Sequence, residues 1–224
     1  MKMSNVLKMG LAVGLGISTV YAADTVKKAA EKPKMAAPVK MGSEKPKAAA
    51  PTKEQQAAMA QAMKMGSPSE AHKVLAPLAG KFSNHVRFWM APDSPVSESN
   101  GESNNAWILG GRFIQESYHG TMGNGQPFEG MGITGYDNVK GEYQSLWLDS
   151  MMTGMMTASG SFDQASQMIK TSGDFSCPMT GEKARWFRSE VKVLDPDHYT
   201  YMSYNKGADG KEFKSIEIMY TRMK

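Results

Sequence analysis

The stretch FEGMGITGYDNVKGEYQSLWLDS, residues 128–150, decides the fold. Two strand-like runs, Phe128 to Tyr136 and Glu142 to Ser150, flank Asp137-Asn138, a residue pair typical of tight turns. Runs of this length joined by so short a turn predict an antiparallel hairpin. From Ala71 onward the chain keeps repeating this arrangement.

Eight further runs bring the total to ten predicted strands. They are Phe82 to Met90, a run ending at Trp107-Ile108, Arg112 to His119, Met155 to Phe162, Met168 to Phe175, Lys183 to Leu194, His198 to Asn205 and Lys211 to Arg222. Turn signals such as Gly123-Asn124-Gly125 and Asp195-Pro196-Asp197 separate them. Even spacing, roughly 8 to 12 residues, predicts an all-β sandwich or an up-and-down barrel. A parallel α/β sheet is excluded because no helical crossovers lie between the runs.

The two faces of a single strand favour the barrel. In the run from Tyr143 to Asp149, one face carries Tyr143, Ser145, Trp147 and Asp149, and the other carries Gln144, Leu146 and Leu148. A sandwich prefers a purely apolar inner face, whereas a barrel with a partly polar lumen accepts mixed faces. We therefore expect a single antiparallel up-and-down barrel over residues 71–224.

Composition limits the class of protein. The 224 residues are 41% hydrophobic and 21% charged, which suits one globular domain of ordinary size. Cys177 is the single cysteine, so a disulfide framework within the chain and a zinc finger are excluded. Residues 1–70 hold 11 Lys against 5 acidic residues, while residues 71–224 hold 15 basic against 17 acidic residues. The predicted domain is thus mildly acidic, and we expect no nucleic-acid partner.

The N-terminal region has the pattern of an exported protein. Lys2 and Lys8 precede an apolar run from Met9 to Val20, and Ala22-Ala23 provides small residues for cleavage. Residues 1–23 are therefore predicted to be a signal peptide, without a membrane span, which places the mature protein in the periplasm or outside the cell. Residues 24–70, rich in Ala, Lys, Pro and Met, predict a disordered tether with one possible short helix from Pro51 to Met65.

Eight short sequence blocks occur in order within residues 75–224. They are Leu78-Ala79-Gly80-Lys81-Phe82, Trp107-Ile108-Leu109-Gly110-Gly111-Arg112-Phe113, Pro127-Phe128-Glu129-Gly130, Gly135-Tyr136-Asp137, Trp147-Leu148-Asp149-Ser150-Met151, Thr153-Gly154, Pro178-Met179-Thr180-Gly181 and Ile218-Met219-Tyr220-Thr221-Arg222. This series resembles the uncharacterised bacterial family called domain of unknown function 1579. The resemblance implies a lipocalin-like (calycin) β-barrel, usually in exported proteins, with no established activity. Phe82 departs from the family, where a tryptophan is expected.

Barrel closure is a further implication of this resemblance. In calycins a glycine-x-aromatic sequence on the first strand meets a basic residue on the last strand. Gly80, Phe82 and Arg222 resemble that set. We therefore expect the Arg222 guanidinium to lie over the Phe82 ring.

Two motifs suggest cofactors, and each has a simpler interpretation. Gly130 to Gly135 matches G-x-G-x-x-G by letter, but a turn and another strand follow it instead of the helix that a dinucleotide site requires. Met151, Met152, Met155 and Met156 form a thioether cluster that could bind Cu(I). Methionines beside a strand turn more commonly fill an irregular apolar mouth, so packing or ligand contact is the favoured interpretation.

The remaining candidate chemistry depends on how the chain folds. His119 or His198 could serve as an axial haem ligand only if it faced an apolar lumen, and the histidines are expected at the surface or at strand edges. Glu116, Asp149 and Glu190 could act as acid and base only if they converge. No G-x-S-x-G elbow is present. We therefore expect a protein without enzymatic activity and without a bound cofactor.

These patterns predict a ligand carrier. We expect the lumen to bind a small amphipathic or hydrophobic molecule, because an aromatic wall with a few polar groups suits such ligands. The residues expected to line the site are Trp107, Tyr118, Trp147, Asp149, Met151, Met155 and Arg188. An enzyme with an acid/base pair in the lumen, a Met-rich metal-handling protein and a structural envelope protein remain the alternatives.

Overall fold

The structure is a computed structural model and describes residues 50–224. The predicted signal peptide and the tether up to residue 49 lie outside the described residues. Residues 50–224 form one compact unit. It is built from helices α1 (Lys53–Met65) and α2 (Glu70–Lys73), the 3-10 turn η1 (Ala76–Leu78) and ten strands.

Helix α1 lies within the range Pro51 to Met65, where the sequence predicted a possible short helix at the end of the tether. Thr52 and Gln55 form a reciprocal capping box, in which the Thr52 hydroxyl accepts a hydrogen bond from the Gln55 backbone N–H. None of its residues is buried. Its C-terminal end contacts the barrel, where Asn138 Nδ2 donates to the carbonyl oxygens of Met65 and Ser67. No helix within residues 50–224 has the length and apolar character needed to cross a membrane.

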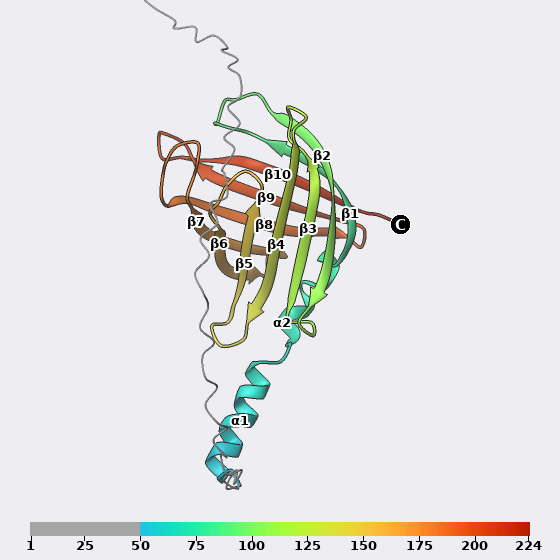
Figure 1. The fold of residues 1–224 in the computed structure, drawn as a ribbon, viewed down its shortest axis with the longest axis vertical. Helices are drawn as coiled ribbons and strands as arrows, with labels where there is room; N and C mark the ends of the chain where they lie inside the picture. Colours follow the sequence, from blue (N-terminus) through green and yellow to red (C-terminus); the bar gives the residue numbers. More distant parts are fainter. Residues whose placement is uncertain (1–49) are drawn as a thin grey trace, which may run out of the picture. The chain divides into compact units, whose positions relative to one another are not determined.

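The ten strands close into one antiparallel barrel, which confirms the predicted fold class (Figure 1). Each strand pairs with its neighbours in sequence, and β1 pairs with β10. The strands are β1 (Gly80–Phe88), β2 (Ser97–Ile108), β3 (Phe113–Thr121), β4 (Pro127–Asp137), β5 (Glu142–Asp149), β6 (Met156–Asp163), β7 (Met168–Phe175), β8 (Arg185–Asp195), β9 (His198–Lys206) and β10 (Glu212–Arg222).

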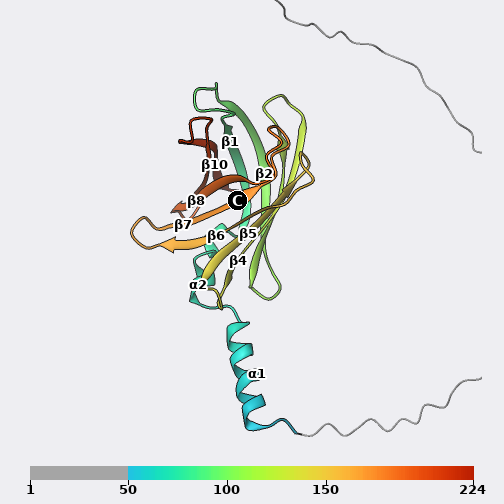
Figure 2. The same cartoon turned by 90° about the vertical axis from the view of Figure 1, so that its left-hand side faces the viewer.

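The two ends of the barrel differ. At one end, here called the helix end, Leu75 and Leu78 from the segment around α2 and η1 pack against Phe82, Tyr199 and Tyr220. This cluster is the hydrophobic core, and Leu75 and Phe82 are fully buried in it. The opposite end, here called the loop end, carries the longer connections between strands (Figure 2). They are residues 89–96 between β1 and β2, 150–155 between β5 and β6, and 176–184 between β7 and β8. The lumen is therefore filled by side chains at the helix end.

Contacts at the seam between β1 and β10 involve the three residues expected there. Phe82 pairs with Arg222, and the guanidinium carbon lies 4.7 Å from the centre of the Phe82 ring. The Arg222 guanidinium also donates to the carbonyl oxygens of Ala79 and Pro77, each at 2.8 Å. Gly80 has a φ of 142°, and any side chain there would clash with the guanidinium. One arginine thus joins the last strand to the segment that fills the helix end.

Candidate functional site

Strand alternation divides the barrel into an inner and an outer face. On β3, the nearly buried Ile114 and Tyr118 face inward, and Glu116 lies between them on the same face. On β5 the inward residues are Tyr143, Ser145, Trp147 and Asp149, the mixed face noted in the sequence. The inner wall is thus both aromatic and polar.

Glu116 is the central polar group of this wall. Its Oε1 accepts a hydrogen bond of 3.1 Å from the Tyr220 hydroxyl. Burial raises the pKa of the Glu116 carboxyl to about 7, although the hydrogen bonds from Tyr220 and Ser103 act to lower it. Glu116 nevertheless keeps some accessible surface, as does the inward Tyr201 on β9. An inward side chain that keeps accessible surface borders space that a water-sized molecule can reach.

Trp147 lies in the same cross-strand row as Glu116, with Gly132 of β4 between them. Its ring packs over Gly130 and Gly132 of β4, and a side chain at Gly130 would clash with it. Its Nε1 donates to Asp149 Oδ2 at 2.9 Å, and Asp149 Oδ1 accepts from the backbone N–H of Met151 at 2.9 Å. These bonds hold the indole ring and the Asp149 carboxylate in a defined orientation along the wall.

Two asparagine side chains near Glu116 keep an atom without a hydrogen-bond partner. Asn105, directly opposite Glu116 on β2, donates from Nδ2 to the Leu78 carbonyl and to the Tyr199 hydroxyl, while its Oδ1 has no partner among the described residues. Asn84 on β1 accepts a hydrogen bond from the Ser103 hydroxyl through Oδ1. Its Nδ2 has no hydrogen-bond partner within residues 50–224. Leaving a buried polar atom unpaired costs about 1–3 kcal/mol. Both atoms therefore keep an unused hydrogen-bonding capacity inside the barrel.

Six of the seven expected ligand residues fall into three places. Tyr118, Trp147 and Asp149 lie on the inner wall. Trp107 lies at the helix end, beside Pro68 and His72 in a hollow of about 280 Å³. Met151 and Met155 lie in the connection between β5 and β6 at the loop end, where they are 51% and 62% exposed.

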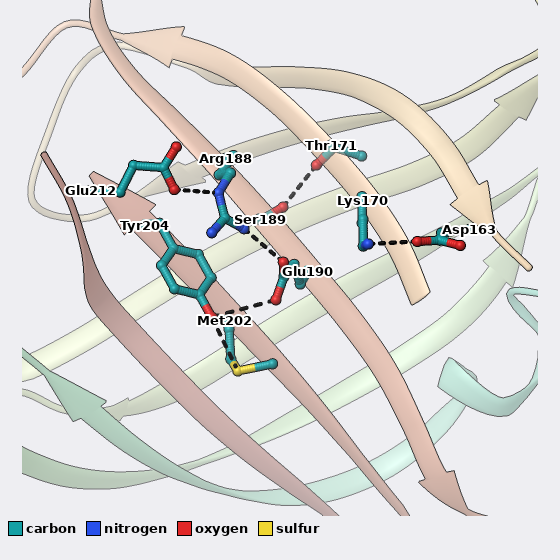
Figure 3. A network of polar contacts seen from close by, with 9 residues as sticks. All are labelled: Asp163, Lys170, Thr171, Arg188, Ser189, Glu190, Met202, Tyr204 and Glu212. Atoms are coloured by element: carbon teal, nitrogen blue, oxygen red, sulfur yellow. Dashed lines mark hydrogen bonds and ion pairs between the residues drawn. The ribbon is translucent and has the colours of Figure 1, made fainter. Parts of the chain in front are cut away.

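Arg188 was expected in the lumen and lies on the outer surface instead. It sits between the buried residues Phe187 and Ser189, so its own side chain points to the opposite face. Its guanidinium pairs with Glu190 and Glu212, each at 2.7 Å, and lies 3.8 Å from the centre of the Tyr204 ring. Figure 3 shows Arg188 between these two carboxylates. Alternation along β8 alone would have shown this orientation.

The placement of Glu190 also separates the three carboxylates considered as acid and base. Glu116 and Asp149 face the lumen, whereas Glu190 belongs to the outer network with Arg188 (Figure 3). A pair involving Glu190 is therefore ruled out by geometry. Glu116 is one of the predicted acid–base candidates, whereas Asn84, Asn105 and Tyr220 are not among the predicted ligand or acid–base residues. Polar residues at inward positions of β1 and β2 were the available signal.

The histidines give no support to an axial haem ligand. His119 follows the inward Tyr118 and its side chain is 71% exposed, and His198 bonds to Asp195 on the outside of the β8–β9 turn. His72 differs from the expectation of a surface or edge position. It is 5% exposed, and its Nδ1 accepts a hydrogen bond from the Ser69 backbone. Within residues 50–224 no group of three or more His, Cys, Asp or Glu side chains could hold a metal ion.

A second hollow, of about 590 Å³, lies mainly on the outer face of β3 to β7. Its apolar lining includes Phe113, Ile133 and Leu146, all of which alternate with inward residues. Polar and charged side chains, among them Lys140 and Asp174, complete the lining. The lining also includes Ser145, which alternation along β5 places on the inner face.

Comparison with known proteins gives a family and a fold. The family model described as "Protein of unknown function (DUF1579)" matches residues 67–222, which confirms the resemblance seen in the sequence. Among solved structures, Rv2717c from M. tuberculosis is similar with a TM-score of 0.51 and 14% identity, covering 70% of this chain and 100% of that one. A de novo designed fluorescence-activating β-barrel is matched at a TM-score of 0.37 and 15% identity, over 70% of this chain and 100% of that one. No curated protein matches.

Proposed function

Because the chain belongs to the DUF1579 family of proteins of unknown function, we propose its function from the geometry of the lumen: the barrel binds a small amphipathic molecule between Glu116 and the loop end. The observation that carries this proposal is the pair of unpaired atoms, Asn84 Nδ2 and Asn105 Oδ1, beside accessible surface on Glu116. A ligand would provide the missing hydrogen bonds.

The aromatic part of the wall supports the apolar half of the proposal. Trp147 and Tyr201 both keep accessible surface while facing the lumen. Tyr118 packs edge-on against Phe128, with 5.7 Å between the ring centres. Aromatic surface of this kind supplies binding energy to an apolar body, and a few fixed polar groups orient it.

Removing the Trp147 ring is expected to weaken binding of an amphipathic probe. An amphipathic dansyl probe without a carboxylate, such as a dansylated alkylamide, should bind saturably to the protein and quench its tryptophan emission. In Trp147→Ala the dissociation constant should rise at least about tenfold, or roughly 1.4 kcal/mol. Titration of the probe by fluorescence measures the change.

Trp89→Ala is the matched control. Trp89 lies on the outer surface, with Arg87 and Lys214 each 4.9 Å from its ring centre. This variant should bind the probe as the unchanged protein does. Absence of saturable binding across a broad panel of amphipathic and apolar molecules would refute the carrier function.

Export is a separate part of the proposal and rests on the sequence of residues 1–23 alone. Cleavage after Ala22 or Ala23 is expected, because these alanines meet the small-residue requirement after the apolar run. N-terminal sequencing of the protein purified from its own cells measures this directly. A mature chain that still begins at Met1 would contradict periplasmic or secreted localisation.

A further inference from the structure

The charges on the inner face are distributed unevenly. The inward arginines lie at the two ends of the barrel, Arg222 at the helix end and Arg185 near the loop end. Arg222 is held by backbone carbonyl groups, and Arg185 pairs with Glu182 at 3.2 Å. Between them lie Glu116 and Asp149. Among the described residues, neither carboxylate has a Lys, Arg or His nitrogen within 4.0 Å. The middle of the lumen is therefore acidic without a basic partner.

The unpaired oxygen of Asn105 points to the same kind of ligand. Asn105 is 5% exposed and stands directly opposite Glu116. Both of its N–H donors are already used, so the capacity that remains on the side chain is that of the acceptor Oδ1, which has no partner among the described residues. Glu116 Oε2 lies near Gly132, where an added Cβ atom would touch both this oxygen and the Trp147 ring. A carboxyl oxygen, an amide oxygen and an indole ring thus share one region.

We propose that the lumen binds a small organic amine, whose ammonium group lies between Glu116 and Asn105 and whose apolar body packs against Trp147. This inference rests on the proposed function and specifies its ligand class. An ammonium group donates to both oxygens and is attracted to aromatic faces. The unpaired Asn84 Nδ2 is available to an acceptor atom, such as a hydroxyl or carbonyl oxygen, on the same molecule.

The proposal implies a defined pH dependence. The groups around Glu116 that can titrate are four tyrosines and one carboxylate: Tyr118 on β3, Tyr199 and Tyr201 on β9, Tyr220 on β10 and Asp149 on β5. The neighbouring positions on β1, β2 and β4 do not titrate; they are Asn84, Ser103, Asn105 and Gly132. Burial raises the pKa of all four tyrosines, so they stay neutral near pH 7. With its pKa at about 7, Glu116 is mainly protonated at pH 5. Attraction for an ammonium group should then be lost on acidification.

Matched sets of probes test the ligand class. Isothermal titration calorimetry on the full mature chain would compare an amine, an alcohol and a carboxylate with the same apolar body: phenethylamine, 2-phenylethanol and phenylacetate. Two further sets start from tryptamine and from cyclohexylmethylamine, each with its neutral and its acidic counterpart. Alkylamines with a pKa of about 10 stay cationic throughout. At pH 8 the best amine should bind at least about tenfold more tightly than its alcohol, and at pH 5 its affinity should fall by about 100-fold, one factor of ten per pH unit below the Glu116 pKa.

Two variants complete the test. Glu116→Gln keeps an acceptor for Tyr220 and removes the charge, so it should abolish both the preference for the amine and its pH dependence. Glu190→Gln changes a carboxylate of the outer network and should leave both intact. Equal or tighter binding of the alcohol or carboxylate, or an unchanged amine preference in Glu116→Gln, would overturn the amine assignment. If the alcohol or the carboxylate binds and Trp147→Ala weakens that binding, the carrier function stands although the amine assignment fails. If no probe binds, both proposals fail.

Discussion

Deleting the last six residues, Met219 to Lys224, is expected to leave the domain unfolded at 25 °C. The deletion removes four of the seven residue pairs between β1 and β10 and reopens the barrel. It also removes Tyr220, which is 5% exposed and stacks on Tyr199 at 4.1 Å. Loss of a buried aromatic side chain alone costs about 3–5 kcal/mol, a large share of the roughly 5–15 kcal/mol that stabilises a typical domain.

Arg222 adds to this loss. Without its guanidinium, the carbonyl groups of Pro77 and Ala79 lose hydrogen bonds that hold the helix-end segment in place. Hydrogen bonds to charged groups contribute roughly 1.5–3 kcal/mol each. The combined loss should therefore exceed the stability of the domain.

Thermal melts followed by circular dichroism measure the effect of the deletion. A chain that begins at Gly66 is the control, because it lacks all of α1, which has no buried residue. This larger truncation should melt within a few degrees of the full chain. If the six-residue deletion melted like the full chain, the seam between β1 and β10 would contribute little to stability.

Glu116→Gln is expected to stabilise the protein at pH 8 and to change how its stability depends on pH. The carboxyl has a pKa of about 7 in the folded barrel, against an ordinary value of 4.5. Between these values the folded protein holds a proton that the unfolded chain has released. Stability therefore falls as pH rises from about 4.5 to 7 and then levels off.

The size of this effect follows from the difference between the two pKa values. It amounts to about 3 kcal/mol of stability at pH 8, or a rise in melting temperature on the order of 10 °C. The amide side chain of the variant carries no charge at any pH, so Glu116→Gln should match the unchanged protein at pH 4 and exceed it at pH 8. Denaturant unfolding at several pH values gives both curves.

Glu190→Gln serves as the control for this prediction. Glu190 pairs with Arg188 on the outer surface, so its replacement should bring no gain at pH 8. Parallel stability curves for Glu116→Gln and the unchanged protein would show that Glu116 does not titrate near pH 7 in the folded state.

Much of the architecture was predictable from the chain because it depends on local patterns. Alternation with period two and short turns such as Asp137-Asn138 marked the ten strands, and β5 and β7 fall within one residue of their predicted ends. The turn after β2 is a further example, because Leu109, Gly110 and Gly111 all have positive φ values there. Successive short connections leave each strand beside its neighbour, so the antiparallel order followed from the same pattern.

The candidate site was only partly predictable. The mixed face of β5 correctly indicated that Trp147 and Asp149 share one side of a strand. The pattern did not reveal Asn105 as the partner of Tyr199, because those residues are far apart in sequence and meet only across the closed barrel. Arg188 was misplaced because its residue type was weighed ahead of its position between two buried neighbours.

The sequence by itself determined the strands, their antiparallel order and the family, because alternation, turn residues and ordered motifs are properties of neighbouring residues. Only the tertiary structure decided which end of the barrel is filled, which polar atoms remain unpaired and how strongly Glu116 holds its proton. Those properties depend on burial, and burial arises when segments distant in the chain, here β1, β3 and β10, come together around one interior.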